Sequence, residues 1–302
     1  MCRSSDLRQA VLAHNDDIAR LLRSELAARG TVAVNLLSSP GSGKTALLEE
    51  ELALARERGV PVAALTADLA TENDARRLAR TGVPVQQVLT GGLCHLEAVM
   101  LRGYLAGWLP PETRILFVEN VGNLVCPAVY DLGESLRVTL ASVTEGEDKP
   151  LKYPTAFGLA QLVLVTKVDL ADAVGFDEAA FLDHVARVNP GVEVVFTSAR
   201  TGQGLGVLLD RALGVREGDR PHRPVMAGGQ DTGAPLPVPD HAHEHEHPHP
   251  HPHPHPHDHI HAHEHTPEHA HHGPDHHHEP DHAHGHPYTP ERPQGTPVAD
   301  RR

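Results

Sequence analysis

Short apolar runs, separated by longer amphipathic stretches, occupy the first three quarters of the chain. Seven of the runs predict buried strands, because they are apolar throughout and end in turn residues. They are the run that begins at Val32 and residues 60–67, 85–89, 114–118, 136–143, 162–165 and 193–196. Helical patterns alternate with these runs, which predicts an α/β fold with a mostly parallel sheet and helices on both of its faces.

The chain opens with a predicted amphipathic helix over residues 5–29. Apolar residues recur in it every three or four positions among polar ones. These residues are Leu7, Val11, Ile18, Leu22 and Leu26. Gly30 is placed to end the helix, which we expect to pack across the sheet. A second helix is predicted over 96–109.

The first predicted strand runs directly into S-S-P-G-S-G-K-T at positions 38–45. Gly41 and Gly43 lack a Cβ, so the backbone there, including the amide of Ser42, can turn its N–H groups toward phosphate oxygens. Ser38 occupies the first glycine position of the usual pattern. Strand, loop and helix in this order predict a phosphate-binding loop. A Gly/Ser-rich connection formed by chance is the alternative.

Lys44 and Thr45 supply the side-chain chemistry of this loop. Lys44 would reach the β- and γ-phosphates and Thr45 would bind Mg²⁺, at the start of a helix predicted over 46–58. Asp68 and Glu119 follow predicted strands and are candidate carboxylate partners of the magnesium ion. A plain turn residue is the alternative for Asp68.

Residues 68–74 also open a further predicted helix, for which Thr71 and Asp74 are suitable caps. Beyond the fourth strand, Glu119 begins the sequence E-N-V-G. An acid followed by glycine at this spacing can sense a γ-phosphate through the amide of Gly122. No glutamine is positioned to orient water and no arginine stands out as a finger, so we expect slow hydrolysis.

Two further loops indicate which base is bound. Thr166-Lys167-Val168-Asp169 is similar to the guanine-reading N-K-x-D motif, with Thr in first place. The carboxylate of Asp169 can accept from guanine N1–H and the 2-amino group together, and the stem of Lys167 would cover the base. Ser198 and Ala199 are similar to the S-A-K loop that backs the same base. GTP is therefore the predicted nucleotide.

The composition changes at Met226. Twenty-two of the 26 histidines lie between His241 and His286, and Tyr288 is the only aromatic residue after Met226. Such a segment cannot bury a core, so we predict a GTPase domain over 1–225 and a disordered His/Pro-rich tail over 226–302. The tail supplies −9 of the formal charge of −14, and basic residues are not clustered, so we expect no nucleic-acid partner.

The chain has three cysteines, Cys2, Cys94 and Cys126. This number makes a disulfide framework improbable and fits a reducing compartment. No apolar run approaches the roughly 20 residues that span a bilayer. Residues 1–30 contain no signal-peptide core. We expect a cytoplasmic protein with no membrane partner.

Cys94, His95 and Cys126 offer thiolate and imidazole groups, which suit Ni²⁺ or Zn²⁺ better than Mg²⁺. Small buried cysteines without a metal are the alternative. Cys126 follows Gly122 closely, so a metal held there could respond to the nucleotide state. In the tail, alternating His and Pro leave spaced imidazoles exposed as nickel ligands. These are His247, His249, His251, His253, His255 and His257. An expression tag is the alternative for the tail.

The chain resembles the HypB family, GTPases that insert nickel during [NiFe]-hydrogenase maturation. The resemblance covers about residues 5–215. Its most specific motifs are N-L-L-S-S-P-G-S-G-K-T (35–45), D-L-A-T-E-N-D-A (68–75), T-G-G-L-C-H-L-E-A (90–98), E-N-V-G-N-L-V-C-P (119–127) and E-G-E-D-K-P-L-K-Y-P (145–154).

The resemblance implies a GTP-dependent homodimer, with Cys94, His95 and Cys126 near the subunit contact. It also implies a nickel-binding partner of the HypA type and the hydrogenase large-subunit precursor as client. The family's N-terminal cysteine-rich nickel motif is represented only by Cys2, and the histidine-rich segment follows the GTPase region instead of preceding it. A urease accessory GTPase of the UreG type and a nickel or zinc storage protein are the alternatives.

Overall fold

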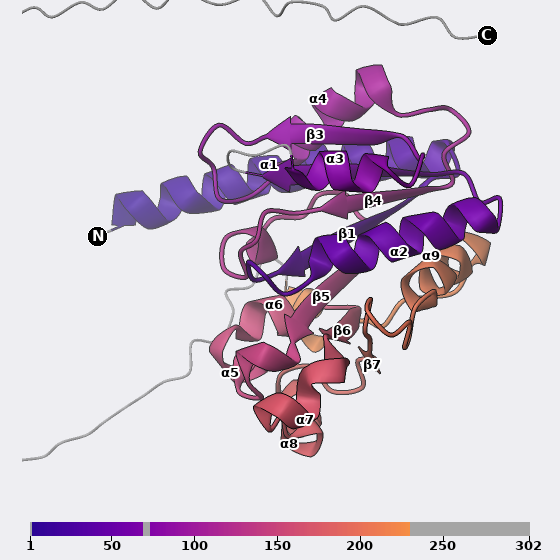
Figure 1. Ribbon diagram of the computed structural model, residues 1–302. Helices are drawn as coiled ribbons and strands as arrows, with labels where there is room; N and C mark the ends of the chain where they lie inside the picture. Colours follow the sequence, from indigo (N-terminus) through magenta and orange to yellow (C-terminus); the bar gives the residue numbers. More distant parts are fainter. Residues whose placement is uncertain (1, 69–72, 230–302) are drawn as a thin grey trace, which may run out of the picture. The chain divides into compact units, whose positions relative to one another are not determined.

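A seven-stranded parallel sheet forms the centre of the part of the chain that the structure describes (Figure 1). This computed structural model describes residues 2–68 and 73–229. The strand order is β3-β2-β4-β1-β5-β6-β7. The strands are β1 (Val32–Ser38), β2 (Val62–Asp68), β3 (Val85–Leu89), β4 (Ile115–Glu119), β5 (Leu136–Ser142), β6 (Leu162–Thr166) and β7 (Val194–Phe196).

Helices cover both faces of the sheet (Figure 1). The α-helices are α1 (Cys2–Ala28), α2 (Lys44–Glu57), α3 (Asn73–Ala79), α4 (Ala98–Trp108), α5 (Lys149–Lys152), α6 (Pro154–Gly158), α7 (Ala171–Val174), α8 (Glu178–Val188) and α9 (Val207–Glu217). Short 3₁₀ helices are η1 (Pro127–Val129), η2 (Val143–Glu145), η3 (Val168–Leu170) and η4 (Val225–Gly229). The predicted α/β architecture is confirmed.

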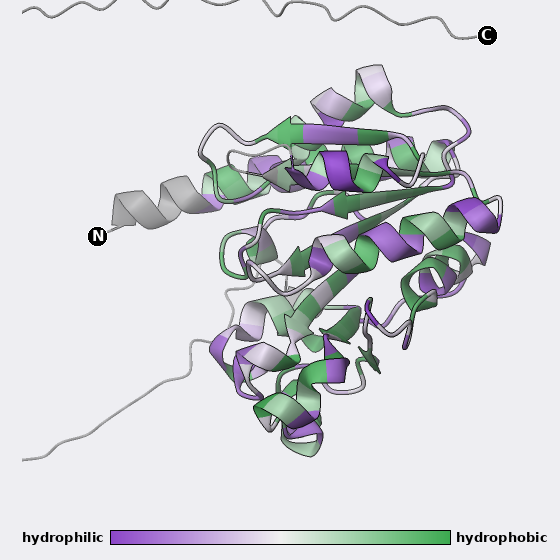
Figure 2. Cartoon of the chain, viewed as in Figure 1, coloured by the Kyte–Doolittle hydropathy of each residue, from purple (hydrophilic) through white to green (hydrophobic). Residues whose placement is uncertain are grey.

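Successive side chains of each strand point into the cores on opposite faces of the sheet, as the two-residue period of a strand requires. In β4, Phe117 joins the core under α2 and α9, whereas Leu116 and Val118 join the core under α1 and α4. A third cluster lies beneath α6 and α8. Figure 2 shows green along the central strands and mixed colours on α2, consistent with an amphipathic helix.

All seven predicted strands are confirmed, with ends shifted by at most two residues. The N-terminal helix is confirmed as well, and Gly30 ends it with a φ of 67°. Leu22 and Leu26 are buried as expected. Val11 is 44% exposed, which contradicts its predicted place in the core. The predicted cap at Asp74 is also wrong, because α3 begins at Asn73 and Asp74 lies in its first turn.

A buried ion pair lies beside the central strands. Arg137 of β5 donates from Nε to Glu134 Oε1 at 2.7 Å, and the backbone N–H of Leu132 donates to Glu134 Oε2 at 2.8 Å. Burial alone would raise the pKa of Glu134, but the charge and hydrogen bonds of Arg137 and nearby backbone donors lower it to about 2. The carboxylate is therefore ionised in the folded protein at neutral pH.

None of the helices among the described residues is both long and apolar enough to span a bilayer.

Replacing Arg137 with Met should lower the free energy of unfolding by about 3–5 kcal/mol at pH 7, because Glu134 keeps a buried charge without its partner. Urea denaturation measures this loss. The loss should shrink as pH falls from about 4.5 toward 2, since the pair stabilises the fold only while Glu134 is ionised. The double variant Glu134→Gln/Arg137→Met should recover part of the stability. Equal losses in the single and double variants, with no dependence on pH, would contradict this account.

Candidate functional site: a nucleotide cavity beside a cysteine and histidine cluster

Because every strand pair is parallel, the carboxyl ends of the strands meet at one edge of the sheet. The phosphate-binding loop leaves β1 there. Gly41 and Gly43 have φ values of 73° and 90°, a left-handed region that side chains disfavour. Gly43 is the N-cap of α2, which begins at Lys44, two residues earlier than predicted. Lys44 and Thr45 therefore lie in the first helical turn.

Glu119 at the end of β4 contacts both of these residues. Thr45 donates its hydroxyl to Glu119 Oε1 at 2.6 Å, and Lys44 Nζ lies 3.6 Å from the same oxygen. Burial raises the pKa of Glu119, the charge of Lys44 and the hydroxyl of Thr45 oppose that effect, and the charge of Asp74 adds to it. Adjacent strands thus bring together three side chains that the sequence predicted as one site.

Two buried polar atoms in this site lack a hydrogen-bond partner among the described residues, Glu119 Oε2 and Ser42 Oγ. Buried polar groups normally have partners, so these atoms are available to a ligand. They lie beside a cavity of ≈ 380 Å³ that Gly41, Lys44 and Gly122 help to line. An unpartnered carboxylate oxygen next to a threonine hydroxyl suits Mg²⁺.

Gly122 approaches the phosphate-binding loop closely. A Cβ added to Gly122 would lie 3.1 Å from Pro40 Cα and 3.2 Å from Pro40 N. Contacts this short with backbone atoms cannot be relieved by a rotamer change. Packing against Pro40 therefore favours glycine at this position, in addition to the predicted role of its amide.

A second cavity of ≈ 400 Å³ adjoins the first, and Gly43 and Arg77 line both. Lys167, Asp169 and Ala199 line this second cavity, as a base-binding site requires. Ser198 Oγ donates to Asp169 Oδ1 at 2.5 Å and Arg200 Nε donates to Oδ2 at 2.7 Å. These two hydrogen bonds lower the pKa of Asp169.

The loop after β6 is tied to the phosphate-binding loop. Thr166 Oγ1 donates to the carbonyl of Ser42 at 2.5 Å, and Lys167 Nζ donates to the carbonyl of Gly41 at 2.6 Å. Lys167 has a φ of 58° and is the one non-glycine residue with positive φ among the described residues. This strained conformation costs about 1–3 kcal/mol, and it directs the side chain across the loop.

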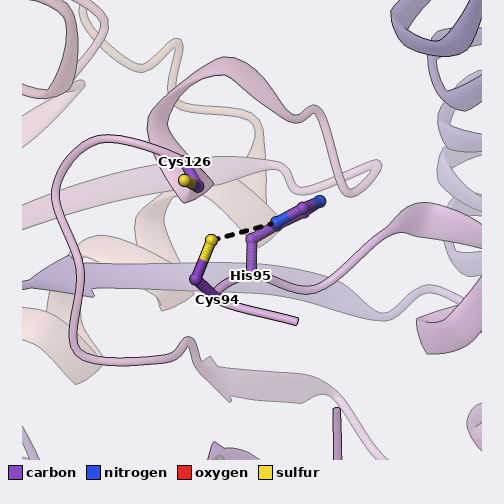
Figure 3. Close-up of side chains that lie close together, drawn as sticks. All are labelled: Cys94, His95 and Cys126. Atoms are coloured by element: carbon purple, nitrogen blue, oxygen red, sulfur yellow. Dashed lines mark hydrogen bonds between the residues drawn. The ribbon is translucent and has the colours of Figure 1, made fainter. Parts of the chain in front are cut away.

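Cys94, His95 and Cys126 come together from two separate loops. Their candidate ligand atoms all lie within 4.8 Å of one another. Figure 3 shows Cys126 facing the adjacent pair, with Cys94 Sγ 3.7 Å from His95 Nδ1. The His95 ring stacks on Tyr130 with centroids 4.0 Å apart. A contact with the Cys126 thiol, together with burial, raises the pKa of Cys94. Binding of a metal by these thiols would therefore release protons.

Two sets of predicted residues lie outside this description. The side chain of Asp68 and the tail histidines from His247 to His257 are not among the described residues. Their predicted roles, and the domain boundary at 225/226, stay predictions.

Sequence reasoning missed two residues of the phosphate cavity. Asp74 and Arg77, three positions apart on α3, both line it. Arg77 Nε donates to Glu49 Oε2 at 2.5 Å, which holds the guanidinium group at the junction of the two cavities. The i, i+3 spacing of an acid and an arginine within N-D-A-R-R was the available signal. The sequence indicated no arginine finger, and the structure places Arg77 in the lining of both cavities without testing that role.

A parallel sheet whose phosphate-binding loop opens a helix, with a buried acid on its lysine and threonine, defines a P-loop nucleotide-binding protein. Residues 32–196 match the CobW/HypB/UreG nucleotide-binding domain. The chain belongs to the HypB family of this class, as its similarity to hydrogenase maturation factors shows.

Hydrogenase maturation factor HypB of Azotobacter vinelandii is 46% identical over 213 residues, which are 70% of this chain and 70% of that protein. The HypB of Escherichia coli (strain K12) is 47% identical over 200 residues, 66% and 69% of the two chains. A crystal structure of HypB from Helicobacter pylori in complex with nickel gives a TM-score of 0.64 at 34% identity, covering 69% of this chain and 98% of that one. The crystal structure of HypB from Archaeoglobus fulgidus gives a TM-score of 0.62 at 36% identity, covering 68% of this chain and 100% of that one.

Replacing Gly122 with Ala should weaken binding of a nucleoside triphosphate analogue about tenfold and change diphosphate binding little. The added Cβ would push the loop away from Pro40, and overpacking of this kind costs about 1–3 kcal/mol. Calorimetric titration with both nucleotides measures the effect. Gly107→Ala, on α4 where an added Cβ meets no atom within 4 Å, is the matched control. Equal weakening of both nucleotides would exclude a role specific to the terminal phosphate.

Proposed function

We propose that this chain is a GTP-hydrolysing nickel metallochaperone that inserts nickel into the [NiFe]-hydrogenase precursor. The observation that carries the proposal is the position of the Cys94, His95 and Cys126 cluster, whose third ligand lies four residues beyond Gly122. A change in the loop that reads the terminal phosphate therefore acts on the metal ligands directly. The nickel in the Helicobacter pylori structure supports nickel as the cargo.

GTP is the proposed nucleotide because Asp169 presents an ionised carboxylate to the second cavity. A carboxylate accepts from the N1–H and 2-amino groups of guanine, whereas adenine has no such pair of donors. Ser198 and Ala199 would back the base. Thr166 and Lys167 would hold the base loop against the phosphate-binding loop, consistent with their bonds to Ser42 and Gly41.

The amides of Gly41, Ser42 and Gly43 would hold the phosphates, and Lys44 would exchange part of its contact with Glu119 for the β- and γ-phosphates. Mg²⁺ would be held by Thr45 and Glu119, with Asp68 as a further ligand, and would neutralise developing phosphate charge. Arg77 lines both cavities, but its ion pair with Glu49 offsets its charge. Slow turnover follows, which suits a switch that must persist in its bound state.

We further propose that GTP promotes a homodimer that covers the metal cluster. Large apolar side chains flank the ligands, with Val125 62% exposed beside Cys126 and Leu93 42% exposed beside Cys94. Exposed apolar residues in one place are typical of an interaction surface. The proposed partners are a HypA-type nickel-binding protein and the hydrogenase large-subunit precursor, in the cytoplasm. Zn²⁺ is an alternative occupant, since the same ligands suit it.

A role in urease maturation of the UreG type is the second candidate. One relative, from Helicobacter hepaticus, is a hydrogenase/urease maturation factor HypB, 39% identical over 212 residues. The sequence E-N-V-G-N-L-V-C-P favours the hydrogenase type, whereas the urease type carries a Cys-Pro-His motif that is absent from this chain. A storage role is the third candidate, which we assign to the tail and which is compatible with delivery.

Lys44→Ala should reduce kcat/KM for GTP by about 100-fold, because it removes a charge-assisted contact worth about 3 kcal/mol. Asp169→Asn should reduce the preference for GTP over ATP, measured as the ratio of their kcat/KM values, by about tenfold or more. The variant should favour xanthosine triphosphate, whose 2-oxo group can accept from the new amide. Phosphate-release assays with GTP, ATP and xanthosine triphosphate measure both. Unchanged GTP turnover in both variants would remove the basis of the proposal.

Deleting residues 226–302 should remove most bound nickel and leave GTP hydrolysis unchanged. The lost ligands are the spaced tail imidazoles, whereas Cys94, His95 and Cys126 remain. Metal analysis after dialysis and hydrogenase activity in cells measure the two roles separately. Hydrogenase maturation should persist when nickel is ample. Failure to mature hydrogenase even in excess nickel would show that storage and delivery are not separable.

A further inference from the structure

Two asparagines lie on either side of Gly122 and join two loops. One is the loop of residues 120–126, called here the phosphate-sensing loop, and the other is the loop of residues 90–97, called here the metal-binding loop. Asn120 Oδ1 accepts from the backbone N–H of Leu96, and Asn123 Nδ2 donates to the carbonyl of Cys94, each at 3.4 Å. The two contacts lie on either side of His95. Asn120 and Asn123 thus join the segment that contains Gly122 to the segment that carries two of the three metal ligands.

Each asparagine is held more tightly by its own loop than by the metal-binding loop. Asn120 Oδ1 also accepts from Val121 N, and Asn123 Oδ1 accepts from Val125 N, both at 2.9 Å. Hydrogen bonds of 2.9 Å are near the optimum, whereas 3.4 Å is beyond the usual range. The side chain of Asn123 therefore moves with the phosphate-sensing loop. A shift of a few tenths of an ångström between the two loops makes or breaks the two contacts of 3.4 Å.

The surroundings of these contacts are fixed. The backbone N–H of Asn120 donates to the carbonyl of Leu36 on β1 at 3.2 Å, and its side-chain Nδ2 lies 3.3 Å from Asn35 Oδ1, so Asn120 is bonded to the central sheet twice. On the other side of the cluster, Arg137 donates to the carbonyls of Ala128 and Tyr130 at 2.9 and 3.0 Å. Tyr130 stacks on His95. With both flanks anchored, the part of the cluster left to respond is the segment from Gly122 to Cys126.

Asn123 lies in the middle of that segment. It is the side chain that connects the segment to Cys94, because its amide nitrogen donates across to the Cys94 carbonyl while its oxygen fixes the turn before Cys126. Displacement of Gly122 relative to Pro40 would therefore change the spacing of the two thiols through Asn123. Asn120 would serve as the fixed point about which the segment moves.

We propose that Asn120 and Asn123 are positioning residues that couple the state of the terminal phosphate to the affinity of Cys94, His95 and Cys126 for nickel. This inference rests on the proposed function, since it assigns residues to the coupling between its two sites. Coupling is reciprocal, so nickel must change the affinity for the nucleotide by the same factor as the nucleotide changes the affinity for nickel. Typical coupling factors are about 5- to 150-fold.

Asn123→Ser is the decisive variant. Serine can still accept from Val125 N in the turn, but its side chain is too short to reach the Cys94 carbonyl. The change is neutral in charge, but it also removes the Asn123 side-chain hydrogen bond that lowers the pKa of Cys94, so the readout is the ratio of two nickel affinities and not either affinity alone. Asn120→Ser is the second variant, and its lost bond to Asn35 makes a fall in thermal stability an expected side effect.

The experiment uses the full chain in a Cys2→Ser background. Thiolate-to-nickel charge-transfer absorption reports the metal at Cys94 and Cys126, because tail imidazoles produce no such band. Free Ni²⁺ is set by a chelator buffer, and its affinity is measured with GDP and with a non-hydrolysable GTP analogue. The affinity for the GTP analogue is then measured with and without Ni²⁺.

In the parent protein the two nickel affinities should differ at least about fivefold. In Asn123→Ser the ratio should fall to within about twofold of one, while affinities for GDP and for the GTP analogue without metal stay unchanged. Asn15→Ser is the matched control. Asn15 braces Ala98 N and the Asp131 carbonyl from α1 without touching the phosphate-sensing loop, so its loss should lower stability and leave the ratio intact.

An unchanged ratio in both Asn123→Ser and Asn120→Ser would overturn the inference while leaving the proposed function standing. A ratio of one in the parent protein would overturn the coupling itself, and with it the delivery mechanism. A ratio lowered equally by Asn15→Ser would show that general loosening, and not these two contacts, carries the effect.

Discussion

The pairing of β1 with β4 is the constraint on which the site depends. It sets the end of one strand, which continues into the phosphate-binding loop, beside the end of the other, which carries Glu119. Lys44 and Thr45 both contact Oε1 of this buried carboxylate, and Oε2 has no hydrogen-bond partner among the described residues. A desolvated acid with one oxygen unpartnered is costly unless a ligand completes it. The fold therefore holds the site in a form that a cation and phosphates can complete.

The segment that follows β4 also connects the phosphate cavity to the cluster of Cys94, His95 and Cys126. Within eight residues the chain passes from Glu119 through Gly122 to Cys126. Asn120 donates to Asn35 on β1. Asn35 in turn donates to Glu134, which is paired with Arg137. Such buried polar networks are stable only when every member is satisfied. The segment from Gly122 to Cys126 therefore starts beside a hydrogen-bonded network on the sheet and contacts the loop of Cys94 through hydrogen bonds of 3.4 Å.

Much of this could be predicted from sequence, because the strands are continuous apolar runs and the phosphate-binding loop has a fixed order of residue types. The strand ends then locate Glu119 and Asp169 without further information. Arg77 could not be placed in this way, since its relevance depends on how α3 packs beside the loop. Nor could the network of Asn35, Glu134 and Arg137 be predicted, because Asn35 is 99 residues from Glu134 in the chain and reaches it through the pairing of β1 with β5. Val11 shows the opposite error. The apolar pattern of the N-terminal helix includes Val11, but the helix is no longer covered by the sheet there, and the side chain is exposed.

The contacts of Asp169 have a further consequence. A carboxylate offers about four acceptor positions, and Ser198 and Arg200 occupy one on each oxygen. Asp169 lines the second cavity, and these two hydrogen bonds hold its carboxylate in one orientation. Little rotational freedom is then lost when a base arrives, so recognition depends on the match between donors and acceptors more than on rearrangement of the protein.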